Sequence, residues 1–600
     1  MKTISMKNVR LNSGYLYDKQ ELNRTTTINA VYDVFAQTGR IGAFDFNYDP
    51  ADPESIKPHF FWDSDVAKWI EGAANITWNN RSPELEKKVD AIVEKIKEHQ
   101  EENGYFNIYF TVVEPENRFK DRRKHELYCA GHLIEAAIAY DRATGKRDFL
   151  DCMEKYADLI YKVFFIEKSA EFTTPGHQEI ELALVRLYRY TGKKKYLDLA
   201  KFFIDNRGVV EELRMDEHYQ THKPLREQTE AVGHSVRAMY LFTAMAMVAK
   251  ETNDTELAEQ CRTLWEDVVF KKMYVTGGLG STYLGEGFTV PYDMPNDTSY
   301  AETCAAIGLM FFSNEMLSLE NNARYADIVE KCLYNGVLSG ISIDGRSFFY
   351  ENPLEINTKE KFEFRGNSRR FPITQRVEVF SVSCCPPNLN RLLSSLGNYI
   401  YGTDGDTLYV NQYISSVLND GEIKCTLSTE YPNDGIIKIS ASGTNRIALR
   451  IPAWCRSFKL NKPYTMEKGY AVIENDGSDI ELCLDMSVRA VYADPRIRTN
   501  VGKVCITRGP VVYCAEAVDN GDELCRFVIP NNPVSKENID PEIGLVALEI
   551  DCEKRIGFEN TCYSYNAPKL KKATLKLIPF NYFANRGESD MMVWFGYEYQ

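Results

Sequence analysis

Apolar residues in the first two-thirds of the chain recur at helical spacing. Val89, Ile92, Val93 and Ile96 lie three or four residues apart, which places them on one face of a helix. Four longer stretches repeat one theme, an apolar helix, a short polar turn and a second helix. These stretches are residues 132–164, 181–205, 237–269 and 310–333. The turns at Thr144-Gly145 and Thr191-Gly192 are typical of glycine-capped helix ends.

This series of helix pairs predicts an α-solenoid or a closed toroid of paired helices. In either architecture the helices build the scaffold, and the loops between them are the usual place for chemistry. Helical patterning ends near "LLSSLGNYIYGTDGD".

From Asp406 onward, apolar and polar positions alternate. Ile447, Leu449 and Ile451 in "NRIALRIPAW" have the period of two that indicates a half-buried strand. Asn419-Asp420-Gly421 and Asp476-Gly477 are sequences typical of hairpin turns. The last third therefore predicts β-sandwich modules. We predict a multidomain α + β protein, with a helical domain at 1–400 and β-sandwich domains at 401–500 and 501–600.

Composition narrows the possible partners. The 600 residues carry a net charge of −15, with a pI near 5.3, which argues against nucleic-acid and anionic-membrane partners. We find neither a membrane-spanning apolar run nor a signal peptide. Most of the 15 cysteines occur singly in apolar patterns, as expected of reduced core residues. The cytoplasm is the expected compartment, and a homodimer is compatible with the sequence.

The unusual sequence Cys384-Cys385-Pro386-Pro387 raises the question of why two thiols are adjacent. Adjacent cysteines do not easily bond to each other, and we expect the two prolines to prevent a helix from starting at once. The pair is suited either to metal binding or to a reactive thiol.

Glu302 and Cys304 lie upstream, at the start of an apolar helix. Together with Cys384 and Cys385 they make three thiols and one carboxylate, a set that suits tetrahedral Zn²⁺. The alternative is that Cys304 is a buried helix cysteine and that Glu302 complements the helix dipole.

Two further groups are candidates for sugar chemistry. Glu286 lies between two glycines, which suits a general acid that a ligand approaches closely, although a solvated loop glutamate has the same pattern. His132, His177 and His234 each follow a glycine and open an apolar helix. Such histidines are commonly caps or core residues, but three in successive helix pairs predict a polar ring around a small polyol.

Several motifs resemble glycoside hydrolase family 127, the β-L-arabinofuranosidase family. They are "FAQTGRIGAFDF", "HELYCAGHLIEAA", "PGHQEIELAL", "GHSVRA", "GEGFTVPYDMPNDTSYAETCA", "FFYENPL" and "SCCPPNLNR", and the resemblance runs in order through nearly the whole chain. It implies an (α/α)6 barrel followed by β-sandwich domains. It also implies zinc ligands (Glu302, Cys304, Cys384 and Cys385), a nucleophile (Cys384), an acid/base (Glu286) and sugar contacts (Gln37, His132, His177, His234 and Tyr350).

The expected function is that of a retaining exo-glycosidase, which releases terminal β-L-arabinofuranose from short arabinosides. In this interpretation Cys385 anchors the zinc ion while Cys384 attacks the sugar. Two alternatives from other classes remain at this stage: a sugar-binding protein with a structural zinc site, and a carbohydrate epimerase or lyase that uses the histidines as bases.

Overall fold

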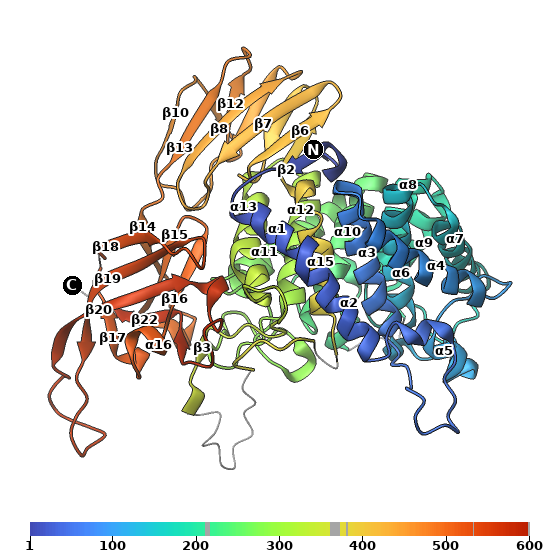
Figure 1. Cartoon of the computed structure of the whole chain (residues 1–600), viewed down its shortest axis with the longest axis horizontal. Helices are drawn as coiled ribbons and strands as arrows, with labels where there is room; N and C mark the ends of the chain where they lie inside the picture. The colour runs from blue at the N-terminus through green and yellow to red at the C-terminus, as the bar shows by residue number, and fades with distance from the viewer. Residues whose placement is uncertain (211–215, 360–372, 380–381, 532, 598–600) are drawn as a thin grey trace.

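The computed structural model describes residues 1–210, 216–359, 373–379, 382–531 and 533–597. A helical barrel is followed by two β modules, as Figure 1 shows; the barrel runs from blue through green to yellow, and the β modules are mostly orange and red. The predicted fold class, an (α/α)6 barrel followed by C-terminal β structure, is confirmed.

The barrel has an inner ring of helices that closes on itself, because each inner helix contacts the next and the last contacts the first. The inner ring consists of α3 (Trp62–Asn79), α6 (Glu126–Thr144), α8 (Ile180–Thr191), α10 (Ser235–Thr252), α12 (Thr303–Leu319) and α15 (Cys385–Leu393). The helices outside it are α1 (Tyr15–Leu22), α2 (Ile28–Gln37), α4 (Pro83–His99), α7 (Asp148–Ile160), α9 (Lys194–Asn206), α11 (Thr255–Lys271) and α13 (Ala323–Lys331). A short helix, α5 (Tyr109–Val112), lies in a connection. The predicted toroid is therefore closed.

The apolar patterns explain the two layers. The inner helices α10 and α12 are buried along most of their length, and their apolar residues are distributed around the whole helix. The outer helix α4 buries only the face made by Leu85, Val89, Ile92, Val93 and Ile96. Gly145 and Gly192 end α6 and α8 in left-handed conformations, as the sequence predicted.

The first β module contains two six-stranded sheets. One has the order β1 (Lys2–Thr3), β4 (Tyr401–Asp404), β5 (Thr407–Val410), β9 (Arg446–Arg450), β12 (Tyr470–Glu474) and β11 (Thr465–Glu467). The other has the order β10 (Phe458–Leu460), β13 (Ile480–Leu484), β8 (Ile436–Ser442), β7 (Ile423–Thr429), β6 (Ser416–Asp420) and β2 (Val9–Leu11). The turn at Asn419-Asp420-Gly421 joins the antiparallel pair β6–β7, as predicted. Asp476-Gly477 does not form a hairpin, because it connects β12 to β13 in the opposite sheet.

The second β module is a ten-stranded sheet. Its order is β14 (Val488–Tyr492), β15 (Lys503–Arg508), β22 (Trp594–Tyr597), β17 (Phe527–Ile529), β19 (Val546–Arg555), β20 (Leu570–Pro579), β16 (Val511–Glu516), β21 (Met591–Met592) and β3 (Glu355–Ile356), and β18 (Ser535–Ile539) pairs with β19. A short helix, α16 (Ala517–Asn520), follows β16. Since β14 pairs with β15, we propose that the second module begins at about Val488 rather than at 501.

A buried arginine joins the barrel to the first β module. Arg450 on β9 is fully buried and pairs with Asp327 and Glu330 of α13; its Nη1 lies 2.6 Å from Asp327 Oδ1. Its Nε also donates to the backbone oxygen of Asn411, so the charge is both paired and hydrogen-bonded. This contact anchors the β module to the barrel.

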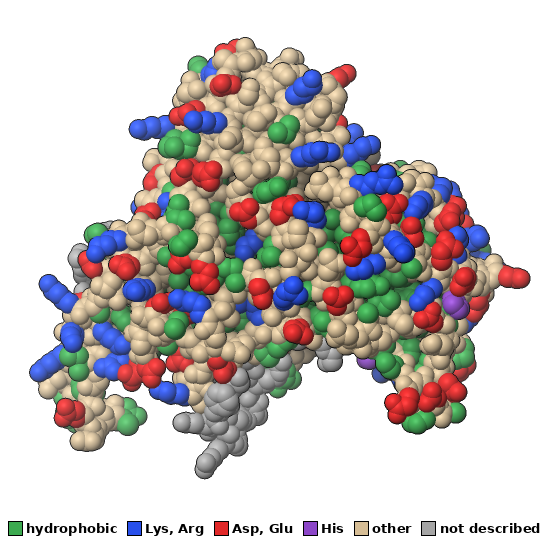
Figure 2. Space-filling model, viewed as in Figure 1, with side chains coloured by type: hydrophobic (Ala, Val, Ile, Leu, Met, Phe, Trp, Pro, Cys, Tyr) green, Lys and Arg blue, Asp and Glu red, His purple; other side chains and the backbone are tan. Residues whose placement is uncertain are grey.

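On the face shown in Figure 2, acidic and basic side chains are interspersed over the barrel and the β modules. Within the described ranges, no helix is at once long and apolar enough to span a bilayer.

Candidate active site

A cavity of about 330 Å³ lies where the inner helices begin. The first turn of α3 and the residues just before α6, α8, α10, α12 and α15 all contribute to its wall. Its lining includes Phe60, Phe61, Ser64, Asp65, His125, Tyr128, His177, His218, His234, Val236, Arg237, Tyr283, Gly285, Glu286, Glu302, Cys304, Tyr350, Val382 and Cys384. Because helix N-termini carry partial positive charge, this end of the barrel favours anionic groups.

The three thiols and Glu302 form a cluster, and Glu302, Cys304 and Cys384 line the cavity. Cys304 Sγ lies 3.3 Å from Cys385 Sγ, and Cys384 Sγ lies 3.7 Å from Cys385 Sγ. Glu302 Oε1 is 3.4 Å from Cys384 Sγ and 3.8 Å from Cys385 Sγ. The four side chains that the sequence grouped are thus one cluster that could hold a metal ion.

The spacing of this cluster fits a tetrahedral zinc ion. Two sulfur atoms on one Zn²⁺ lie about 3.8 Å apart, since each Zn–S bond is about 2.3 Å long. Burial raises the pKa of Glu302 and of Cys385, so a nearby cation is needed to hold these groups in their charged forms. Glu302 Oε2 is also buried without a hydrogen-bond partner among the described residues. The donor set therefore fits a thiophilic divalent metal.

Helix α15 begins at Cys385, directly after Cys384. The prediction that the two prolines delay this helix is wrong, because Pro386 and Pro387 lie in its first turn, where backbone N–H groups have no partner within the helix. The prolines instead rigidify the helix start. Cys384 lines the cavity, whereas Cys385 is fully buried behind it.

Glu286 pairs with the histidine that caps α10. His234 Nδ1 accepts a hydrogen bond from the Val236 N–H, so the neutral ring carries its proton on Nε2, which lies 2.8 Å from Glu286 Oε2. Although burial opposes it, the hydrogen bond from His234 lowers the pKa of Glu286 to about 2. This hydrogen bond therefore favours the ionised form of Glu286.

The glycines beside Glu286 allow two backbones to pack together. A Cβ on Gly287 would lie 2.6 Å from the Gly233 oxygen, and Phe288 N–H donates to that same oxygen. Glu286 itself has a φ of 53°, in the left-handed region. The glycines thus allow the backbone around Glu286 to approach the backbone at Gly233, directly before His234. This packing places the Glu286 carboxylate next to the His234 imidazole.

The three histidines of the predicted ring differ in their positions. His177 and His234 line the cavity, with ring centroids 5.6 Å apart. His132 does not: it is fully buried inside α6, where its Nδ1 lies 3.2 Å from Glu179 Oε1. The sequence suggested that His132 opens its helix, but α6 begins at Glu126.

His125 and His218, which sequence reasoning missed, also line the cavity. The His125 ring lies 5.3 Å from that of His177, and the His218 ring lies 5.6 Å from that of His234, so four imidazoles form a row. Burial, followed by the nearby Arg237 guanidinium, lowers the pKa of His125 to about 3 and of His218 to about 4. They are neutral near pH 7 and can both donate and accept hydrogen bonds.

Tyr350 and Gln37 have different positions. Tyr350 lines the cavity, and its hydroxyl lies 3.3 Å from Cys384 Sγ. Gln37 is exposed at the end of α2 and is not part of the cavity lining. The structure thus brings together every predicted chemical group except Gln37 and His132.

Comparison with known proteins agrees with this geometry. Residues 8–398 match the family model of the β-L-arabinofuranosidase GH127 catalytic domain, and residues 488–596 match that of the glycoside hydrolase family 127 C-terminal domain. The chain is 35% identical, over 588 residues, to a non-reducing end β-L-arabinofuranosidase of Bifidobacterium longum subsp. longum. That alignment covers 89% of this chain and 88% of the relative.

Solved structures give the same result. A GH127 β-L-arabinofuranosidase from Geobacillus stearothermophilus T6 superposes with a TM-score of 0.93 at 39% identity, covering 98% of this chain and 100% of that one. The GH127 β-arabinofuranosidase BT3674 superposes with a TM-score of 0.89 at 33% identity, covering 100% of this chain and 98% of that one.

Proposed function

The chain belongs to glycoside hydrolase family 127, and we propose that it is a retaining exo-glycosidase that releases terminal β-L-arabinofuranose from short arabinosides. The observation that carries the proposal is that a thiol, Cys384, and a carboxylate, Glu286, line one cavity, each within 4.8 Å of Glu302. Retaining glycosidases need a nucleophile and an acid/base in such a pair. Membership of a hydrolase family favours hydrolysis over the sugar-binding and epimerase alternatives.

Zn²⁺ is the proposed cofactor, with Glu302, Cys304, Cys384 and Cys385 as its ligands. When bound, zinc would hold the thiols deprotonated near neutral pH.

In the proposed first step Cys384 Sγ attacks C1 of the sugar while the C1–O bond to the leaving group breaks. Cys384 is suited to this role because its sulfur faces the cavity, whereas Cys385 is buried and remains to anchor the cluster. The Tyr350 hydroxyl lies next to the Cys384 sulfur, where it can stabilise the negative charge of the thiolate by a hydrogen bond.

Glu286 gives its proton to the departing oxygen and later takes one from the water that cleaves the S–C1 bond. The hydrogen bond from His234 lowers the pKa of Glu286, and we propose that the bound sugar takes over this donor, so that the pKa rises and Glu286 holds a proton. The row of neutral histidines can bind the sugar hydroxyls as donors and acceptors.

Glu286→Gln provides a test of the acid/base role. We expect turnover of unactivated arabinosides to fall by roughly 10²–10⁴-fold, since an amide cannot donate a proton as an acid does. Substrates with a good leaving group, such as nitrophenolate, should retain their first step and show a burst. An equal loss on both substrate types would assign Glu286 to binding instead.

A panel of aryl pentosides tests the substrate class. We expect the β-L-arabinofuranoside to be hydrolysed with retention, and the matching arabinopyranoside and xylopyranoside to be cleaved far more slowly. Product anomers followed by NMR would report the stereochemistry. Turnover of the pyranosides alone would disprove the furanoside specificity.

We also propose the cytoplasm as the site of action, on imported oligosaccharides. All 15 cysteines are unpaired, which supports a reducing compartment.

A further inference from the structure

A second and larger cavity, of about 680 Å³, lies at the opposite end of the barrel. Its walls come from the C-terminal halves of the inner helices and from the segment around β1. Its charged lining residues are Lys2, Arg142, Arg186, Arg189, Lys250, Arg391, Glu71, Glu135, Glu251 and Glu315. Cations therefore outnumber anions in this cavity, although the chain as a whole carries a net charge of −15.

All four of these glutamates already have arginine partners. Arg391 Nη1 lies 2.7 Å from Glu135 Oε2 and 2.9 Å from Glu71 Oε2, and Arg186 also pairs with Glu135. Glu251 and Glu315 are both paired with Arg189. The four glutamates therefore share three of the six lining cations.

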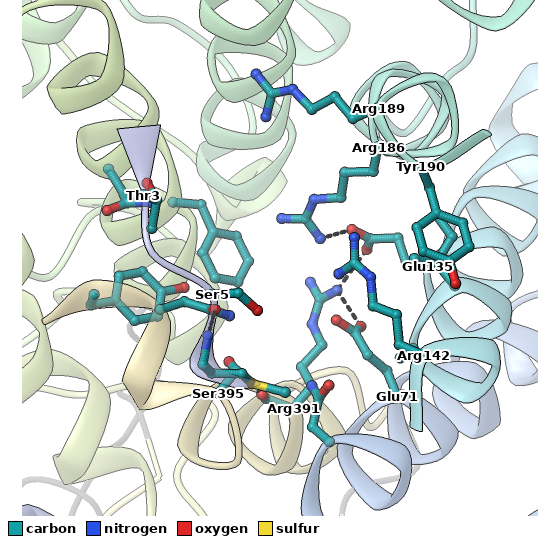
Figure 3. Close-up of a pocket in the computed structure, with 18 of the residues that line it drawn as sticks. Thr3, Ser5, Glu71, Glu135, Arg142, Arg186, Arg189, Tyr190, Arg391 and Ser395 are labelled. Atoms are coloured by element: carbon teal, nitrogen blue, oxygen red, sulfur yellow. Dashed lines mark hydrogen bonds and ion pairs between the residues drawn. The ribbon is translucent and has the colours of Figure 1, made fainter. Parts of the chain in front are cut away.

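Of the three lining cations outside these pairs, Lys2, Arg142 and Lys250, Arg142 is the guanidinium. Its guanidinium lies over the Tyr190 ring, 5.0 Å from the ring centroid, and makes no hydrogen bond or ion pair with any residue that the structure describes. Figure 3 shows Arg142, Arg186 and Arg391 reaching into the cavity from α6, α8 and α15. A guanidinium stacked on an aromatic ring is pre-organised for bidentate binding of a carboxylate or phosphate.

Helix capping is the structural alternative for these cations. Arg142 lies in the last turn of α6, where a cation offsets the partial negative charge of the helix end. That effect accounts for a basic residue on each helix, but it requires neither the cavity nor the convergence of three guanidinium groups from separate helices.

We propose that this cavity binds a small organic anion through a phosphate or carboxylate group held by Arg142 and Arg186. Its volume is in the range of small-molecule sites. Trp78 and Phe311 offer apolar walls for the rest of the ligand, and Asn75 and Asn314 offer polar contacts. The site is separate from the catalytic one, so the proposal does not depend on the glycosidase assignment.

Isothermal titration calorimetry of the full-length, metal-loaded protein with inorganic phosphate, and separately with citrate, tests the proposal. We expect saturable binding of at least one of them in low-salt buffer. In Arg142→Gln the affinity should fall by roughly tenfold or more, because a charge-assisted hydrogen bond is lost. Arg142 has no polar partner among the described residues, so this variant should remain folded.

Arg496→Gln is the matched control, since Arg496 also stacks on a tyrosine, Tyr292, but lies outside the cavity. It should bind the anion as the unmodified protein does. Absence of binding by both anions would overturn the proposal. So would binding that Arg142→Gln leaves unchanged, because the anion would then occupy another site. A lower melting temperature of Arg142→Gln together with unchanged affinity would show that Arg142 only caps its helix.

Discussion

Replacing Cys384 with serine is expected to reduce turnover by roughly 10⁴-fold or more while leaving the fold intact. A serine hydroxyl is a far weaker nucleophile at neutral pH than a metal-bound thiolate, because its pKa is much higher. Only one atom changes, on a half-buried side chain at the cavity wall, so the barrel core is not disturbed. Initial rates on an aryl β-L-arabinofuranoside, with circular dichroism to check folding, would measure both effects.

Cys483→Ser serves as the control, because it makes the same change at a half-buried cysteine in β13, away from the cavity. It should retain full activity. A haloacetamide-bearing arabinofuranose analogue should add one label, on the peptide that holds Cys384. Label on Cys385 would reverse the assignment within the pair, and label on Glu286 or Glu302 would show that a carboxylate attacks.

The second large effect concerns the metal. Purified protein should contain about one Zn²⁺ per chain, and Cys304→Ser should lose most of it and nearly all activity. Cys304 is buried, and its sulfur lies against that of Cys385. Its replacement removes one of the proposed ligands, and without the metal the buried Glu302 and Cys385 lose the cation that balances their negative charge. Elemental analysis by mass spectrometry would give the metal content, and thermal unfolding would show the accompanying loss of stability.

Cys261→Ser is the matched control, since Cys261 is a fully buried cysteine of α11 outside the cluster. It should keep its zinc even if it is less stable. A metal-free protein with full activity would refute both the ligand set and the role of zinc in activating Cys384.

Local patterning was sufficient to predict the helix pairs and the strand-rich last third. Helical spacing identifies a helix such as α4 because its apolar face is narrow and regular. Local patterns could not predict that the ring of helices closes, because closure depends on the packing of α15 against α3, and these two helices are far apart in the sequence. The pairing of β1 and β2 with strands near residues 401–420 is equally non-local.

At the site, residues in distinctive motifs were easier to place than single histidines. The adjacent cysteines and Glu302 stand out by type and context, and they are one cluster in the structure. His132 and His125 lie in the same motif, and the choice between them depends on where α6 begins. His125 adopts a left-handed conformation just before that helix, a backbone feature with no clear signature in the amino-acid pattern. Family resemblance suggested Gln37, which this structure leaves outside the cavity lining.

The closed ring has a consequence for how the chain is made. Asn23 Nδ2 donates to the backbone oxygen of Asn390, which lies 367 residues later in the sequence. The barrel therefore cannot close until about two-thirds of the chain has been synthesised and has left the ribosome. Until then the surfaces of α3 and α15 that pack together are exposed, as in slow-folding proteins rich in distant contacts. Cys384 and Cys385 lie at the start of α15 and are synthesised late in the barrel, so the nascent protein cannot assemble the proposed metal-binding cluster until its last inner helix has docked.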